Sequence, residues 1–126
     1  PLFSTVQSTW NLLEQSAGPA LAEAHDAGLG VVIKESVANG RLTDRDPQTT
    51  APLREAFPSH SADTIAIAVI LAQPWVDSVI SGAATRDQLK SNIAALDIGA
   101  AVVDEVPPMV EDPEEYWHTR AGLKWT

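Results

Sequence analysis

The 126-residue sequence has no cysteine, which excludes a disulfide, a thiolate zinc site and a cysteine nucleophile. It is also poor in basic residues, with 8 Lys and Arg against 17 Asp and Glu, and its formal net charge is −9. This charge argues against nucleic acid or an anionic membrane surface as a partner. No apolar run reaches the length of a membrane span, the longest being Ile65–Ala72. With no visible signal peptide, we expect a cytoplasmic protein.

The residues that are present give the composition of a globular protein, with 44% hydrophobic and 20% charged residues. A chain of this length can enclose its own core, so we expect residues 1–126 to form a single domain. The chain begins with Pro1 rather than Met, and we expect it to be processed or to be a piece of a longer protein. His25, His60 and His118 lack the spacing of metal ligands or of a catalytic triad, so no metal site is predicted.

The most informative stretch is Pro74–Leu96, which predicts a strand, a turn of small residues and a helix. The helix begins with a capping box made by Thr85 and Gln88. A turn without bulky side chains lets a ligand approach the backbone, and a helix N-terminus suits an anion such as phosphate. Most connections of this kind bind nothing, so an ordinary strand–helix connection is the alternative.

The rest of the chain repeats this alternation of strands and helices. Strands are predicted at Thr5–Trp10, Gly30–Glu35 and Val76–Ile80. Helices are predicted at Ala20–Ala27 after a Ser16 cap, Pro52–Phe57, Ala62–Gln73, Thr85–Leu96, Ile98–Val106 and Glu114–Leu123. The pattern is (βα)₃ with parallel strands, which cannot close a barrel and leaves two open edges. The long polar loop Ser36–Gln48 is a candidate to cover a ligand.

One helix raises a question of burial. Ala62–Gln73 is apolar nearly all round, which is typical of a helix buried in a larger protein. We therefore expect that one copy of the chain cannot cover it. Trp10, Trp75, Trp117 and Trp125 add further apolar area. The sequence thus favours either a homo-oligomer or a missing N-terminal half.

Four segments resemble the aldo-keto reductases, in the right order and over essentially the whole chain. They are TVQSTWNLLEQ (Thr5–Gln15), GLGVVIKESVANGRLT (Gly28–Thr43), SVISGAATRDQLKSNIAALD (Ser78–Asp97) and the tail EEYWHTRAGLKW. They are similar to the family's sixth, seventh and eighth strands with their loops, and to its tail helix. The resemblance implies a partial TIM (β/α)₈ barrel, a (βα)₃ half-barrel with parallel strands and C-terminal tail helices.

The resemblance also implies a function and a set of cofactor-binding residues. The intact barrel would be an oxidoreductase that transfers a hydride between NADP(H) and a small carbonyl compound or alcohol, with NAD(H) not excluded. The implied contacts are Gln7 to the nicotinamide carboxamide, Ser36, Asn39 and Arg41 along the pyrophosphate, Gly82 and Thr85 near the 2′-phosphate, and Gln88 and Asn92 at the adenosine end.

Some positions depart from the family pattern. Lys34 stands where many members have an aromatic residue that stacks on the nicotinamide. Gly82 and Gln88 stand where many have Lys and Arg. The family's catalytic Asp, Tyr, Lys and His come from the other half of the barrel, so no catalytic residue is predicted in this chain and no turnover is expected from it alone. The alternative is a non-catalytic half-barrel that binds a nucleotide or a protein.

Overall fold

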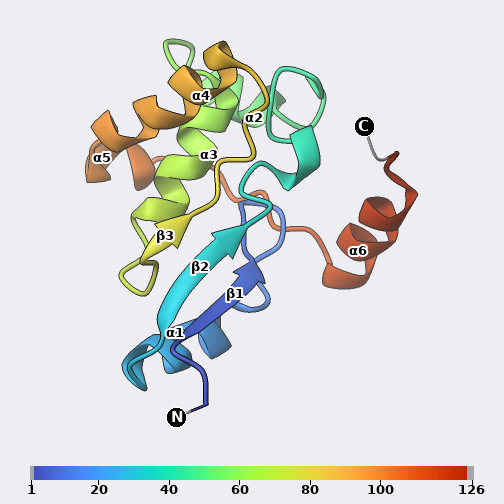
Figure 1. Cartoon of the computed structure of the whole chain (residues 1–126). Helices are drawn as coiled ribbons and strands as arrows, with labels where there is room; N and C mark the ends of the chain where they lie inside the picture. Colours follow the sequence, from blue (N-terminus) through green and yellow to red (C-terminus); the bar gives the residue numbers. More distant parts are fainter. Residues whose placement is uncertain (1, 125–126) are drawn as a thin grey trace.

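The computed structural model describes residues 2–124, and these contain one sheet of three parallel strands. The strands are β1 (Thr5–Thr9), β2 (Gly30–Lys34) and β3 (Ser78–Val79), in the order β1-β2-β3 (Figure 1). Gln7 pairs with Val32, and Val32 pairs with Ser78. The predicted (βα)₃ half-barrel is therefore confirmed. Strand β3 is shorter than predicted.

Helices follow each strand, and short ones fill the connections. The α-helices are α1 (Gly18–Asp26), α2 (Ala51–Ala56), α3 (Ala62–Leu71), α4 (Arg86–Ile93), α5 (Ala100–Val103) and α6 (Pro113–Gly122). Two 3₁₀-helices, η1 (Ala38–Gly40) and η2 (Ala94–Asp97), complete the set within residues 2–124. None of the helices in this part of the chain has the length and apolar character needed to cross a membrane.

The start of α1 differs from its prediction. Ala17, rather than Ser16, is the N-cap residue, and no side chain caps the helix. In the turn before the helix, the backbone N–H of Ser16 donates to Oε1 of Glu14 at 2.8 Å. This hydrogen bond places Ser16 in the preceding turn. The predicted stop is confirmed, because Gly28 follows α1 with φ +93° and its N–H donates to the carbonyl of His25.

The two faces of the sheet have different surroundings. Val31 and Ile33 are fully buried on the face that α1 and α3 cover. Gln7 and Lys34 are exposed on the opposite face. In a closed barrel this second face is the interior. The half-barrel therefore leaves its interior face open.

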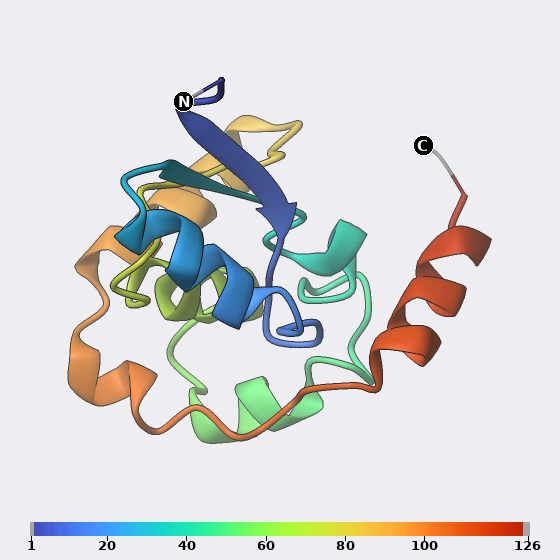
Figure 2. The same cartoon turned by 90° about the horizontal axis from the view of Figure 1, so that it is seen from below.

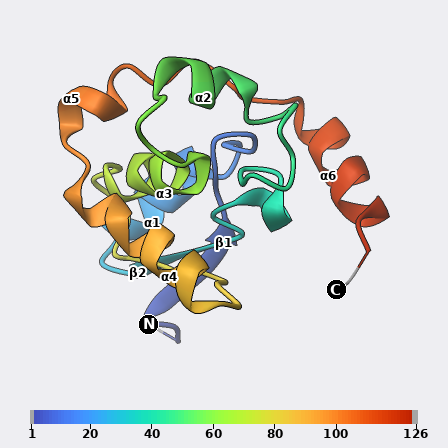
Figure 3. The same ribbon diagram turned by 90° about the horizontal axis from the view of Figure 1, so that it is seen from above.

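One copy of the chain covers most of helix α3, which corrects the expectation that it could not, although Leu71 at the C-terminal end of the helix is 38% exposed. Every residue from Thr64 to Ile70 is buried. The sheet covers one side of α3, and α2, α4, η2 and α5 cover the others (Figure 3). The sequence pattern missed this in part because the weakly patterned segment 98–109 also adds cover, and its Ile98, Val103 and Met109 pack on the core.

The tail crosses the molecule before it forms the last helix. Figure 2 shows the segment between α5 and α6 running past α2, with α6 at the periphery. Among the tryptophans, Trp10 is buried and packs edge-to-face on Trp75 with 5.5 Å between ring centroids. Trp117 on α6 is 44% exposed. Trp125 lies outside the described residues.

Candidate functional site

Gln7 lies on the open face of the sheet. Its side chain is exposed and makes no hydrogen bond to residues 2–124. Lys34 lies on the same face, at the carboxyl end of β2, and pairs in the ladder with Thr9. An amide carries both donors and acceptors, so Gln7 can recognise a polar ligand placed against this face.

The loop after β2 is strained and partly buried. Glu35, Ala38 and Asn39 all have positive φ angles, of 55°, 50° and 56°. Non-glycine residues rarely adopt this conformation, and such clusters persist only where the surroundings hold them. Ala38 and Leu42 are buried and fix the loop to the core, whereas Asn39 is exposed. Only part of this polar loop is therefore available to a ligand.

Ser36 joins two strand ends. Its hydroxyl donates to the carbonyl of Ile80 at 3.1 Å, and its side chain is 1% exposed. The same strand ends also meet through the backbone N–H of Ile80, which donates to Ile33. Ser36 thereby fixes the end of β3 against β2, and its hydroxyl faces into the protein.

Arg41 is engaged with the tail. Its guanidinium forms a two-fold hydrogen-bonded ion pair with Glu111, with Nη1 3.0 Å from Oε2. The hydrogen bond to Glu111 raises the pKa of Arg41, and the guanidinium carbon lies 6.0 Å from the centroid of the Tyr116 ring. Bidentate pairs of this kind are among the stronger polar contacts of proteins. Arg41 therefore joins the β2 loop to the C-terminal segment.

The turn after β3 is open at Gly82. Its φ is +68°, and a Cβ built there would meet nothing within 4 Å. The predicted capping box of α4 is confirmed, because Thr85 Oγ1 accepts from the N–H of Gln88 at 3.1 Å. Oε1 of Gln88 accepts in return from the N–H groups of Ala84 and Thr85. The amide of Gln88 thus folds back over the turn.

Asn92 points away from solvent and toward α3. It is 9% exposed, and its amide lies 2.6 Å from Ser81 Oγ. The amide orientation that satisfies its neighbours places the nitrogen 2.7 Å from Oδ2 of Asp63. Gln88 and Asn92, although four residues apart on one helix, therefore differ in surroundings: Gln88 is exposed over the turn and Asn92 is buried beneath it.

A cluster that the sequence did not predict lies at the carboxyl ends of β1 and β2. Its centre is Asn11, which is fully buried and donates from Nδ2 to the carbonyl of Glu35 at 2.9 Å and to the hydroxyl of Tyr116 at 3.1 Å. Tyr116 donates to Oε2 of Glu35 at 3.4 Å, and Nε of Arg120 donates to Oε1 at 3.0 Å. Burial is the main cause that raises the pKa of Tyr116 to about 12.

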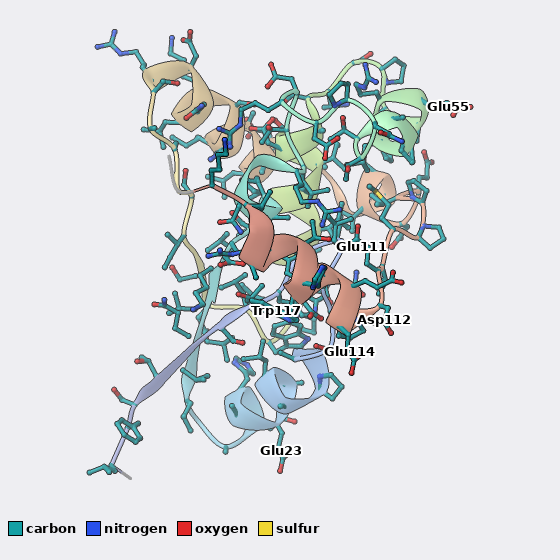
Figure 4. All side chains as sticks on the ribbon, turned by 90° about the vertical axis from the view of Figure 1, so that its right-hand side faces the viewer. Glu23, Glu55, Glu111, Asp112, Glu114 and Trp117 are labelled. Carbon is teal, nitrogen blue, oxygen red and sulfur yellow. The ribbon has the colours of Figure 1, made fainter. Side chains whose placement is uncertain are left out.

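A second buried carboxylate completes this cluster. Glu14 is 1% exposed, and Oε2 accepts from the indole N–H of Trp117 at 2.6 Å. Figure 4 views the molecule from the side of α6 and labels Trp117 and Glu111 there. No function is predicted for Tyr116 from the sequence. An Asn and an acid directly after strand ends were the signal that could have identified the cluster.

The three parallel strands with their helices define a class of architecture, part of a (β/α)₈ barrel. The matching solved structures include an aldo-keto reductase from Bacillus halodurans. Its apo form has a TM-score of 0.67 and 22% identity, covering 87% of this chain and 46% of that one. Its holo form gives the same TM-score and identity, with 86% and 44% covered.

A thermostable aldo-keto reductase solved with the inhibitor epalrestat matches with a TM-score of 0.61 and 17% identity. That match covers 79% of this chain and 37% of the other. No protein-family model matches the sequence, and the search of curated proteins finds no match. The chain thus has the fold of part of an aldo-keto reductase, as the sequence predicted, and spans less than half the length of each of these structures.

Proposed function

We propose that residues 1–126 form one structural unit, the nicotinamide cofactor site of a barrel oxidoreductase, with NADP(H) as the cofactor. The observation that carries this proposal is the open carboxyl-end region of β1–β3, in a fold of the aldo-keto reductase type. Active sites of such barrels lie at this end of the strands. When bound, the reduced cofactor would donate a hydride to a carbonyl carbon, and the oxidised cofactor would accept one from an alcohol carbon.

The residues present fit a dinucleotide. The free amide of Gln7 can pair with a carboxamide on the open face. Gly82 lets the backbone approach a phosphate, and the N-terminus of α4 adds a favourable dipole there. Asn39 is exposed and turned outward at the strained loop, and Arg86 supplies a cation in the first turn of α4.

The other candidate residues would act by holding these groups in place. Ser36 fixes β3 to β2, and Arg41 fixes the loop to Glu111. Thr85 and Gln88 close the turn that carries Gly82. Asn92 holds the same turn from below, through its contact with Ser81. These residues shape the site without each having to touch the cofactor.

Proton transfer to the substrate would come from outside these residues. Tyr116 is buried, and because its pKa is raised to about 12 it is a poor acid at neutral pH. No group of three or more histidine, aspartate and glutamate side chains within residues 2–124 could hold a metal ion. We therefore propose that the 126 residues alone bind cofactor but do not turn over a carbonyl substrate.

We also propose that the rest of the barrel covers the open parts of this half. An apolar groove of about 160 Å³ lies between α3, β3 and α4, and Leu89, Ile93 and Leu96 line it. Leu96 is 71% exposed and Ile93 is 53% exposed, although both are apolar. Parallel strands with bare edges need further strands beside them. A complementary barrel half would cover the apolar groove and pair with the bare strand edges.

The test is an NADPH titration of the complete protein that carries this chain, followed by nicotinamide fluorescence. We expect Gln7→Ala to weaken binding about tenfold, which corresponds to one lost hydrogen bond to a polar ligand. Thr5→Ala is the matched control, because Thr5 is exposed on the same face of the same strand. A wild-type protein that binds neither NADPH nor NADH would contradict the proposal, as would equal affinities in the two variants.

A further inference from the structure

Helix α6 and the residue Glu111 before it form hydrogen bonds to the loops that follow two strands. Glu111 pairs with Arg41, Tyr116 and Arg120 pair with Glu35, and Trp117 pairs with Glu14. The backbone N–H of Glu111 adds one more bond, to the carbonyl of Leu13 at 2.8 Å. The tail is therefore attached at the carboxyl-end face of the sheet, where the proposed site lies.

These contacts converge on the strained part of the β2 loop. Glu35, with φ +55°, is held by Asn11 at its carbonyl and by Tyr116 and Arg120 at its carboxylate. Six residues later, Arg41 is held by Glu111. The strained turn at Ala38 and Asn39 lies between these two attachment points. A backbone of this kind keeps its conformation only while its surroundings hold it.

We propose that α6 and the segment before it position the cofactor loop, with Glu111 and Tyr116 as the positioning residues that fix Glu35–Leu42 for dinucleotide binding. The part of this inference that concerns the cofactor rests on the function proposed above. Docking of the tail presets the loop, so binding does not have to order it. A preset loop increases affinity because the cost of ordering has already been met before the ligand arrives.

The contacts of Tyr116 and Glu111 are complementary. Tyr116 is 1% exposed, and its ring lies beside the Arg41 guanidinium, so it joins both ends of the strained segment. The carboxylate of Glu111 accepts hydrogen bonds from Arg41, at one end of the strained segment. Glu115 lies on α6 next to Tyr116, is exposed, and makes no side-chain hydrogen bond to the described residues. It therefore provides a matched control for a carboxylate-to-amide change.

The first arm of the test is hydrogen exchange on the cofactor-free complete protein. We expect Glu111→Gln and Tyr116→Phe to speed exchange of the backbone amides of residues 36–42 about tenfold and to leave the amides of α3 at wild-type rates. In the control variant Glu115→Gln, the amides of residues 36–42 are expected to exchange at wild-type rates as well. General destabilisation would instead speed exchange in α3 as well. The exchanged pair Arg41→Glu with Glu111→Arg is expected to restore loop protection. Unchanged exchange of 36–42 in both single variants would overturn the proposal.

The second arm is an NADPH titration of the same proteins. We expect Glu111→Gln and Tyr116→Phe to bind NADPH about tenfold more weakly than Glu115→Gln does. Loss of loop protection with unchanged NADPH affinity would overturn the positioning role. Absence of NADPH and NADH binding in the wild type would overturn the proposed function. In that case the exchange data decide separately whether α6 holds the loop.

Discussion

The hydroxyl oxygen of Tyr116 lies 3.1 Å from Nδ2 of Asn11, although 105 residues separate them in the sequence. This contact joins the end of the first strand to the last helix. Both side chains are at most 1% exposed, so neither group can exchange this partner for water. The C-terminal segment is thus part of the architecture of the strand ends.

The first prediction uses the fact that Tyr116 is the single tyrosine of the chain. Burial favours its neutral form and raises its pKa to about 12, so phenolate absorbance is expected to appear about two units higher in the folded chain than in denaturant. The folded state then binds more protons between about pH 10 and 12, and its free energy of unfolding falls as pH rises through this range. An ultraviolet pH titration in buffer and in urea measures both states. Coincident titration curves would show that the phenol is not buried.

Much of the fold could be predicted because local chemistry marks it clearly. The continuous apolar run of β2 and the glycine after α1 are signals that lie within a few residues of the elements they mark. The capping box of α4 also lies within four residues, and the structure contains it as expected. The cap of α1 was predicted one residue too early, because the propensity for Ser at an N-cap does not fix where the helix begins, and Ala17 holds that position.

The site was harder to predict because its residues have partners that are far away in the sequence. The resemblance to the aldo-keto reductases gives Arg41 and Asn92 as cofactor contacts, yet Arg41 is paired with Glu111, and Asn92 lies between Asp63 and Ser81. Those partners lie outside the motif that identified each residue. Gln7, on the open face, and Asn39, in the β2 loop, are exposed and keep the side chains that their predicted roles need.

The second prediction concerns the support beneath the β3 turn. Asn92→Ala removes an amide that lies between Ser81 and Asp63, and we expect the free energy of unfolding to fall by about 1–3 kcal/mol. Lys90→Ala is the control, because Lys90 is exposed on the same helix and its side chain makes no hydrogen bond within residues 2–124. Urea denaturation of both variants gives the comparison. Equal stability would mean that the amide does not hold the turn.

The third prediction concerns the apolar groove beside α4. Ile93→Asn is expected to have little effect on the stability of the 126-residue chain, where Ile93 is 53% exposed. In the complete protein the same change is expected to cost about 1–3 kcal/mol, because the rest of the barrel would cover this side chain. Lys90→Asn serves as the control in both settings. If Ile93→Asn has the same effect in the chain and in the complete protein, nothing covers the groove.

The central claim is that this chain holds the cofactor, and a hydrogen-exchange footprint of NADPH on the complete protein tests it most directly. We predict that NADPH slows exchange at the exposed part of the β2 loop around Asn39 and at the turn from Gly82 to Gln88, because these backbone groups would face the dinucleotide. The amides of α2, on the far side of α3 from the sheet, serve as the internal reference. Slower exchange at the loop and the turn, with α2 unchanged, is the result that the account predicts. NADPH binding that leaves both segments at their cofactor-free rates would contradict it.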